Sequence, residues 1–302
     1  MTALRIATRS SRLALVQANS VADALTATHP DLEVEMVEVS TEGDQDRSTP
    51  LSVLGGRGVF VKAVENALLD GRADVAVHSL KDVPTDAVAS LTIAAVPERA
   101  DPRDVLVASG GRPLSALPEG ARVGTSSRRR VALLRALRPD LALAEIRGNV
   151  DTRLDRVAEG EYDGAILAAA GLERLGRLHE ATQLFDAMQF LPAPGQGALG
   201  IQCRDDDATT VARLAQLDDA ETRAATDAER GFLEALGAGC SLPVGAYATV
   251  DGELLSVRGM LAAHDDALPD FGDATGPVSE AAAIGRALGE RLQAAVASGA
   301  PG

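Results

Sequence analysis

Apolar residues form short continuous runs in some segments of this chain and recur with the spacing of a helix in others. The segment 4–8 (LRIAT) is a short apolar run, and 11–26 repeats with the spacing of an amphipathic helix. The stretch 34–39 (VEMVEV) alternates imperfectly and predicts a strand, and a helix over about 60–69 and a buried strand over 74–78 follow it. Strands that alternate with helices predict a mostly parallel sheet, and therefore an α/β protein.

Two patterns in the first part of the chain recur further along. The run LRIATRSSRLALVQ is echoed at 121–137 (ARVGTSSRRRVALLRAL), and each reads as a strand, paired serines and a helix. The run 64–82 is echoed at 153–174, and each reads as a helix, an acidic-Gly turn and a buried strand. Because the echoes keep their order and separation, they predict two domains of like architecture that face one another across a cleft.

Two Pro/Gly-rich segments, 97–104 (PERADPRD) and 191–197 (LPAPGQG), are the predicted crossings between those domains. After about residue 218 the pattern predicts a helix, a Gly-rich turn, strands near 246–250 and 254–262, and a final helix. The expected fold is therefore α/β, with two similar domains that resemble periplasmic binding proteins and a small α+β C-terminal domain. The expected domains are 1–98 with 194–216, 103–191, and 218–302.

Composition narrows the functional class. The chain has 302 residues, of which 46% are hydrophobic, which suffices for more than one core. A net charge of −15 argues against nucleic acid or an anionic membrane surface as the main partner. No apolar run reaches the roughly 20 residues of a membrane span, and arginines interrupt the apolar stretches of the N-terminus, unlike a secretory signal. A cytoplasmic location is expected.

The 2 cysteines and 4 histidines are too few and too scattered to predict a disulfide framework or a zinc site, so no metal is expected. Cys203 lies in a strand-like segment, GIQCR, and is expected to be a small buried residue. Cys240 lies in a Gly-rich turn, GAGCSLPVG, where a cysteine serves as a nucleophile or attachment point, or packs as a small apolar residue.

The segment from Arg122 to Arg156 is rich in positive charge: it contains nine arginines and four acidic residues, a local charge of +5. Within it, GTSSRRR reads as a strand, a turn with a serine N-cap, and a helix start carrying Arg129 and Arg130. The free N–H groups of a helix start favour an anion, and arginine suits carboxylates. The alternative is a solvated face in which these arginines pair with local acids.

Similar residues follow other predicted strands. Arg147 ends a strand, Arg153 lies near the next helix start, and Arg9 and Ser11 form an anion-friendly helix start in the first predicted domain. In α/β sheets, ligands bind where strands end. Together these positions predict a polyanionic ligand with several carboxylates.

Lys81 and Asp82 come directly after the buried strand DVAV, in the motif HSLKDVPT. A carboxylate beside a lysine stays ionised and serves as a proton acceptor, a proton donor or a counter-ion. Taken alone, the motif also fits an ordinary surface Lys-Asp pair, and His78 fits a hydrogen-bonded core histidine better than a base.

In this order and spacing, the motifs resemble the hydroxymethylbilane synthase (porphobilinogen deaminase) family. The matching pieces are LRIATRSS, GGRGVFVK, ADVAVHSLKDVPT, DPRD, GTSSRRR, RGNVDTRL, AAAGLERLG, PAPGQGALGI and GAGCSLPVG. The resemblance implies a transferase that joins four porphobilinogen molecules head to tail with loss of ammonia. It further implies a dipyrromethane primer held by a thioether, and release of hydroxymethylbilane for tetrapyrrole and haem biosynthesis.

The resemblance also implies residue roles. Cys240 would carry the dipyrromethane, and Asp82, beside Lys81, would be the catalytic carboxylate that stabilises the cations formed as ammonia leaves. The other matching positions would hold the acetate and propionate groups of the cofactor or the substrate. For the cofactor they are Lys81, Asp82, Thr125, Ser127, Arg129 and Arg130, and for the substrate Arg9, Ser11, Ser79, Arg147, Arg153 and Arg174.

Three residues depart from the family pattern: Glu42 stands where arginine is often found, Arg57 where lysine is common, and Arg128 extends the usual arginine pair to three. A solute-binding protein is one alternative, which the Cys240 loop and the missing signal sequence disfavour. An aminotransferring or phosphate-handling enzyme is another, but the sequence has neither a lysine in a cofactor-type setting nor a P-loop. The expected partner is porphobilinogen, with no nucleic acid and no membrane, and the chain is expected to act as a monomer.

Overall fold

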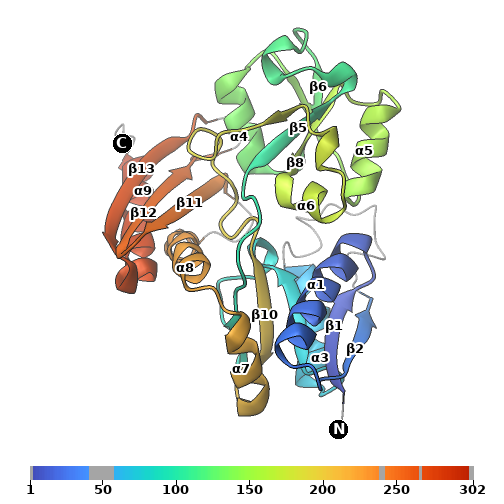
Figure 1. The fold of residues 1–302 in the computed structure, drawn as a ribbon. Helices are drawn as coiled ribbons and strands as arrows, with labels where there is room; N and C mark the ends of the chain where they lie inside the picture. Colours follow the sequence, from blue (N-terminus) through green and yellow to red (C-terminus); the bar gives the residue numbers. More distant parts are fainter. Residues whose placement is uncertain (1–2, 41–57, 238–241, 265–266, 299–302) are drawn as a thin grey trace. The chain divides into compact units, whose positions relative to one another are not determined.

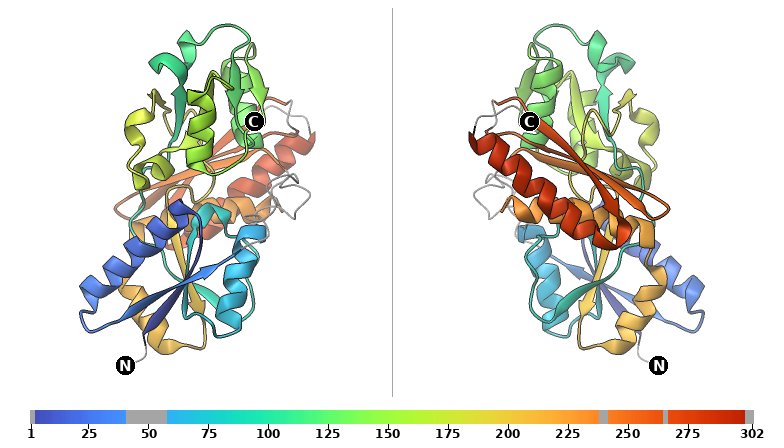
Figure 2. Two further views of the ribbon diagram at one scale, coloured as in Figure 1. Left: turned by 90° about the vertical axis from the view of Figure 1, so that its right-hand side faces the viewer. Right: turned by 90° about the vertical axis from the view of Figure 1, so that its left-hand side faces the viewer.

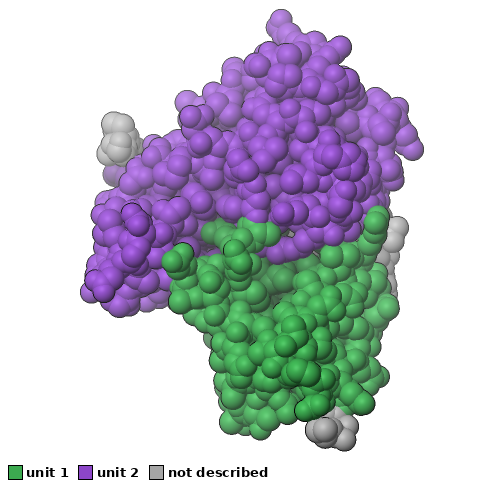
Figure 3. Space-filling model, in the orientation of Figure 1, with its two compact units in different colours: residues 1–100, 198–223 green, residues 101–197, 224–302 purple. Residues whose placement is uncertain are grey.

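The structure is a computed structural model that describes residues 3–40, 58–237, 242–264 and 267–298. Contacts divide the chain into two compact units, residues 1–100 with 198–223 and residues 101–197 with 224–302 (Figure 3). The expected three-domain boundaries stay a prediction. Three of the positions singled out in the sequence lie outside the described residues: Glu42, Arg57 and Cys240.

The first unit is built on a five-stranded sheet (Figure 1). In sheet order its strands are β2 (Val34–Val39), β1 (Leu4–Arg9), β3 (Val75–Ser79), β10 (Leu199–Arg204) and β4 (Leu91–Ala95). β1 runs parallel to β2 and β3, whereas β10 runs antiparallel to β3 and β4. Only β10 therefore opposes the direction of the other four, as expected for a mostly parallel sheet.

Two helices cover opposite faces of this sheet. Successive side chains of a strand point to opposite faces, so neighbouring residues contact different helices. Ile6 packs with α1 (Arg12–Thr28), whereas the next residue, Ala7, packs with α3 (Gly58–Leu69). The short helices α7 (Ala208–Leu214) and η5 (Ala215–Leu217) adjoin the α1 side, and η1 (Leu80–Asp82) follows β3 directly.

The second unit contains a sheet of the same design. In sheet order its strands are β7 (Ala142–Ala144), β6 (Arg122–Gly124), β8 (Gly164–Ala168), β5 (Asp104–Ala108) and β9 (Gln183–Leu184). β6 is parallel to β7 and β8, and β5 is antiparallel to β8 and β9. One face packs on α4 (Arg128–Leu137), and the other on α5 (Val150–Ala158) and α6 (Ala169–Arg174). The α/β class and the repeated architecture are thus confirmed.

The rest of the second unit is an antiparallel sheet of β11 (Val244–Asp251), β12 (Leu254–Leu261) and β13 (Asp270–Pro277), which packs on α8 (Ala220–Ala235) and α9 (Ala281–Ser298). Figure 2 shows α9 crossing one face of this sheet. The sequence predicted two of these strands and missed β13 (DFGDATGP). β13 shows no alternation of large apolar residues in the sequence, because Gly272 and Gly276 stand where the strand packs on α9. A Cβ on Gly276 would lie 2.7 Å from the Ile284 Cδ1 atom.

Four short 3₁₀ helices complete the described elements: Ser109–Gly111, Leu114–Ala116, Leu178–Glu180 and Val278–Glu280. None of the described helices combines the length and apolar character needed to cross a membrane.

Candidate functional site

The predicted catalytic pair lies in η1, at the end of β3. Leu80, the residue before the pair, is buried with Val96 and Ala198. Its N–H donates to the Ala198 carbonyl at 3.0 Å, which ties the strand end to β10. Lys81 and Asp82 are themselves half-buried. An apolar anchor therefore holds the backbone of the turn, while the two polar side chains reach the surface of the unit.

The other predicted positions of the first unit lie at the same edge of the sheet. Arg9 ends β1 and Ser79 ends β3, which is parallel to it. Ser11 is the N-cap of α1, and its Oγ accepts from the Ala14 N–H at 3.3 Å, at the helix start that the sequence predicted. Strands that run parallel end at one edge, so the edge collects Arg9, Ser11, Ser79, Lys81 and Asp82.

Gln17 contacts this edge as well, although the sequence pattern did not predict it. It is buried in α1, and its Nε2 donates to the Ser79 Oγ at 2.8 Å. Ser79 thereby accepts one hydrogen bond, which leaves its own hydroxyl hydrogen to be donated elsewhere. Helical spacing alone could not reveal this role, because Ser79 lies 62 residues away in the chain.

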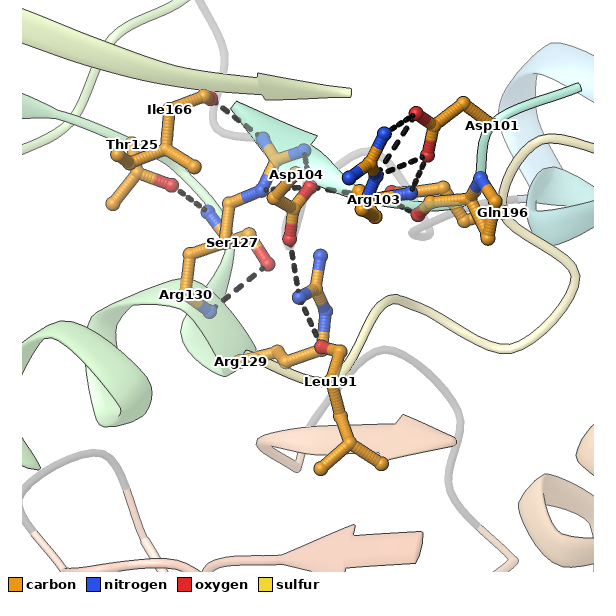
Figure 4. Close-up of polar contacts among 11 residues, drawn as sticks. Asp101, Arg103, Asp104, Thr125, Ser127, Arg129, Arg130, Ile166, Leu191 and Gln196 are labelled. Carbon is orange, nitrogen blue, oxygen red and sulfur yellow. Dashed lines mark hydrogen bonds and ion pairs between the residues drawn. The ribbon is translucent and has the colours of Figure 1, made fainter. Parts of the chain in front are cut away.

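In the second unit, Arg129 and Arg130 are buried around one carboxylate (Figure 4). Arg129 Nη1 lies 2.6 Å from Asp104 Oδ2, and Arg130 Nη2 lies 2.6 Å from Asp104 Oδ1. The guanidinium groups also donate to backbone carbonyls, Arg129 to Leu191 at 2.5 Å and Arg130 to Ile166 at 2.7 Å. The anion that both arginines bind in the structure is thus an internal one. Their predicted contact with a cofactor stays a prediction.

Charge strongly favours the ionised form of Asp104. Burial alone would raise the pKa of this carboxyl group, but the charges of Arg129 and Arg130, with their hydrogen bonds, hold it well below its ordinary range. The surface pairing considered from the sequence does not describe these two arginines, whose side chains are only 5% and 8% exposed. Two positive groups share one negative group, so the cluster keeps a net positive charge.

Gln196 adds the segment 191–197 to this cluster. Its Nε2 donates to Asp104 Oδ1 at 2.9 Å and to the Pro102 carbonyl at 2.7 Å. The adjacent Gly195 N–H donates to the buried carboxylate of Glu229 at 2.7 Å. The sequence predicted that the chain crosses between domains at 191–197. It did not indicate that Gln196, in this segment, forms a hydrogen bond with Asp104. The only sign of a special role for Asp104 in the sequence is that this acidic residue begins an apolar strand.

Replacing Asp104 with asparagine is expected to destabilise the protein by about 3–5 kcal/mol, because two buried arginines would lose their counter-ion. Denaturant unfolding measures the change. Asp101→Asn is the matched control, because Asp101 pairs with Arg103, whose side chain is 43% exposed. The expected loss of stability in this variant is about 1 kcal/mol or less. Equal losses in the two variants would refute the role given to Asp104.

The same carboxylate gives the stability a pH dependence. The folded-state pKa of Asp104 is depressed, so its contribution is present above the unfolded-state value of about 4 and is lost as pH falls below it. Asp104→Asn should therefore flatten the acid limb of the stability curve.

The start of α4 explains how these arginines are presented. Ser127 is the N-cap, and its Oγ accepts from the Arg130 N–H at 3.5 Å. The Thr125 Oγ1 accepts from the Ser127 N–H at 3.2 Å, and the Ser126 Oγ donates to the Ile146 carbonyl at 2.6 Å. The predicted strand, N-cap and helix are confirmed, with Ser127 rather than Ser126 as the cap.

Arg153, on α5, has a different environment from the buried pair. Its Nε donates to the Gly148 carbonyl at 2.9 Å, and no acidic side chain in the described part of the chain forms an ion pair with it. Burial, followed by the charges of Arg130, Arg147 and Arg156, lowers the pKa of Arg153 to about 10. A cation among cations is unfavourable unless an anion joins it. The predicted contact of Arg153 with a substrate carboxylate stays a prediction.

The backbone next to Arg153 depends on one glycine. Gly148 has φ +106°, and a Cβ there would lie 2.8 Å from Thr152 Cγ2. This conformation suits glycine, and the Gly148 carbonyl is the acceptor for Arg153. The neighbouring Arg147 is half-buried, and its Nε lies 3.6 Å from Glu145 Oε1.

Arg174, at the end of α6, donates from Nη2 to the Gly197 carbonyl at 2.7 Å. Burial lowers its pKa, and Glu173 opposes that shift. Its hydrogen-bond partner is thus a backbone oxygen, as for Arg153, and its predicted contact with substrate stays a prediction.

Cys203 is fully buried in β10, as expected. Burial raises the pKa of its thiol to about 11, so the reactive thiolate is scarce at neutral pH. Among the described residues, the histidines, cysteines and carboxylates form no cluster suited to a metal ion.

Comparison with known proteins gives consistent matches along the chain. The family model "Porphobilinogen deaminase, dipyromethane cofactor binding domain" matches residues 4–212, and "Porphobilinogen deaminase, C-terminal domain" matches residues 224–294. The porphobilinogen deaminase of Roseiflexus castenholzii is 49% identical over 289 residues, covering 96% of this chain and 95% of the relative. That of Xanthomonas euvesicatoria pv. vesicatoria is 48% identical over 292 residues, covering 97% and 96%.

Among solved structures, the methionine binding protein MetQ aligns with a TM-score of 0.47 and 13% identity, over 71% of this chain and 89% of MetQ.

Proposed function

The chain belongs to the porphobilinogen deaminase family, and we propose from that premise how its own residues serve the family's reaction. The family polymerises porphobilinogen on a dipyrromethane cofactor in tetrapyrrole biosynthesis, so the protein is a transferase with porphobilinogen as its substrate.

The observation that carries the proposal is the environment of Arg153, a cation with arginine neighbours and a carbonyl acceptor. Each porphobilinogen unit bears two carboxylates, so a growing chain brings many negative charges. Arg147, Arg153 and Arg174 bind these carboxylates through their guanidinium groups. In the first unit, Arg9, Ser11 and Ser79 bind a further carboxylate at the sheet edge.

The second unit fits an anionic cofactor. The Arg129–Asp104–Arg130 cluster keeps a net positive charge beside the α4 start. We assign Arg129, Arg130, Thr125 and Ser127 to the cofactor side, where Asp104 holds the two arginines in fixed orientations. When bound, the dipyrromethane supplies the terminal pyrrole to which each new unit is joined.

Attachment of that cofactor requires a reactive thiol. The chain has 2 cysteines, and the raised pKa and full burial of Cys203 make it unsuitable. Cys240 is therefore the attachment residue. A covalent tether keeps the growing chain beside the reacting groups and replaces repeated bimolecular encounters.

Asp82 is the catalytic carboxylate of this proposal. It lies at the edge of the sheet with Lys81, half-buried after the anchored Leu80. As ammonia leaves porphobilinogen, positive charge develops on the substrate, and a carboxylate fixed beside it lowers the energy of that state. Asp82 then accepts the proton that is lost when the new bond has formed, and Lys81 takes part in holding the cofactor.

The test of the carboxylate site is Arg153→Gln. We expect KM for porphobilinogen to rise about 10- to 100-fold, because a charge-assisted contact is lost. Stability should be unchanged or higher, because an uncompensated cation is removed. Arg156→Gln is the control on the same helix, where Arg156 lies 3.5 Å from Glu161 and both side chains are exposed. Steady-state kinetics and denaturant unfolding measure both quantities. Loss of stability with an unchanged KM would make Arg153 structural.

We further propose that the protein acts in the cytoplasm as a monomer, without nucleic acid or membrane partners. The family's role in tetrapyrrole biosynthesis supports the location, and the net charge of −15 supports the absence of nucleic acid. Cell fractionation and sedimentation of the purified protein test these statements.

A further inference from the structure

Three buried polar side chains form a hydrogen-bonded chain on the α3 face of the first sheet. They are His78 on β3, Gln202 on β10 and Glu65 on α3, with exposed fractions of 6%, 4% and 8%. His78 Nε2 lies 3.1 Å from Gln202 Oε1, and Gln202 Nε2 donates to Glu65 Oε1 at 3.1 Å. The surrounding face is apolar, and includes Ala76 and Leu68. Buried polar groups destabilise a fold unless each is paired, and here each is paired with the next.

The chain has a fixed polarity. A carboxylate at Glu65 only accepts, so Gln202 turns its amide nitrogen toward Glu65 and its oxygen toward His78. His78 must then carry its hydrogen on Nε2. Burial lowers the pKa of His78 to about 4, against the opposing effects of the hydrogen bond to Gln202 and the charge of Asp82. At neutral pH His78 is therefore an uncharged donor, suited to holding geometry rather than to moving protons.

His78 also lies close to the predicted catalytic turn. It lies four residues before Asp82, near enough for the two groups to interact electrostatically. Leu80 anchors the turn through apolar packing and its N–H bond to Ala198. The His78 chain adds side-chain contacts that join β3 to both β10 and α3. An uncharged His78 also leaves the negative charge of Asp82 available to a cationic substrate.

We propose that His78, through Gln202 and Glu65, is a positioning residue that holds Asp82 where charge develops on the substrate. This inference rests on the role proposed for Asp82. The three residues touch no reacting atom in this proposal and act through the end of β3.

Two pairs of variants test it. His78→Leu and Glu65→Leu remove a donor and an acceptor, whereas His78→Gln and Glu65→Gln keep an amide donor and an amide acceptor in nearly the same places. The measurement is kcat and KM for porphobilinogen, expressed per molecule that carries the dipyrromethane by intact mass. We expect the leucine variants to lose about 100-fold in kcat with little change in KM, as for a misplaced catalytic group. The glutamine variants should recover most of the loss.

Cys203→Ala is the matched control, because Cys203 lies next to Gln202 on β10 but packs on the α1 face. It should lose stability and keep kcat. Wild-type kcat in loaded, folded leucine variants would overturn the proposal, and so would a glutamine variant as slow as its leucine partner. If His78→Leu does not fold, His78→Asn carries the test, since its amide is too short to reach Gln202.

Asp82→Asn, measured in parallel, distinguishes a failure of the role proposed for Asp82 from a failure of the role proposed for His78. A fast Asp82→Asn enzyme would remove the proposed role of Asp82 and this inference with it. A slow Asp82→Asn enzyme together with normal leucine variants would remove this inference alone.

Discussion

Cys240→Ser should abolish activity and lower the intact mass by one dipyrromethane unit relative to the wild-type protein. A serine hydroxyl is a poor nucleophile without an adjacent base, so the thioether cannot form. Without a tether, each addition becomes a bimolecular encounter, and the loss amounts to several powers of ten. Mass spectrometry of the purified protein and an assay with porphobilinogen measure the two effects.

The second cysteine provides the control for this experiment. Cys203→Ala should keep the added mass and the activity, because Cys203 is buried in β10 and its thiol pKa is raised to about 11. An active wild-type protein whose mass equals that of the bare sequence would disprove the tether. Retention of the added mass in Cys240→Ser would move the attachment to another residue.

Asp82→Asn should retain the cofactor yet turn over about 10³-fold more slowly. Asparagine keeps the size of the side chain and one acceptor oxygen, but it removes the negative charge that stabilises a cationic substrate and accepts a proton. KM should change little, because the carboxylates of the substrate are held by other residues. Steady-state and single-turnover kinetics on the loaded enzyme measure the change.

Asp86→Asn is the matched control, since Asp86 is an exposed aspartate four residues further along the same loop. It should behave as wild type. A near-normal kcat in Asp82→Asn would return the Lys81-Asp82 pair to an ordinary surface pair, which the motif alone also allowed.

Arginines that lie in the same segment of the sequence have different partners in the fold. Arg129, Arg130 and Arg153 belong to one cluster of charge in the sequence. In the fold, Arg129 and Arg130 share the buried Asp104, whereas Arg153 has a backbone carbonyl and arginine neighbours. Removing a partner from a buried ion pair is costly, so variants of Arg129 report on folding as well as on cofactor binding. Variants of Arg153 give the cleaner functional test.

Local pattern was sufficient for the elements and for their repetition. The strand predicted at 34–39 has the bounds of β2, and the serines before α1 and α4 cap those helices. These features depend on side-chain periodicity and on contacts within one turn, which neighbouring residues determine. The repeated order of strand, helix and strand then predicted two sheets of one design, and the motif spacing indicated the family.

Pairings across the chain depended on the tertiary structure. Asp104 lies 25 and 26 residues from the arginines that it pairs, and Glu65 lies 137 residues from Gln202. No periodicity records such partners, because they meet only when β5 and β10 enter their sheets against the direction of the parallel strands. The sequence by itself determined the elements and the family, and it predicted that arginines, an aspartate and a cysteine serve this protein's chemistry. Only the folded chain decided that Arg129 and Arg130 bind an internal carboxylate and that Cys203 is buried with a raised thiol pKa, because both depend on which distant residues pack together.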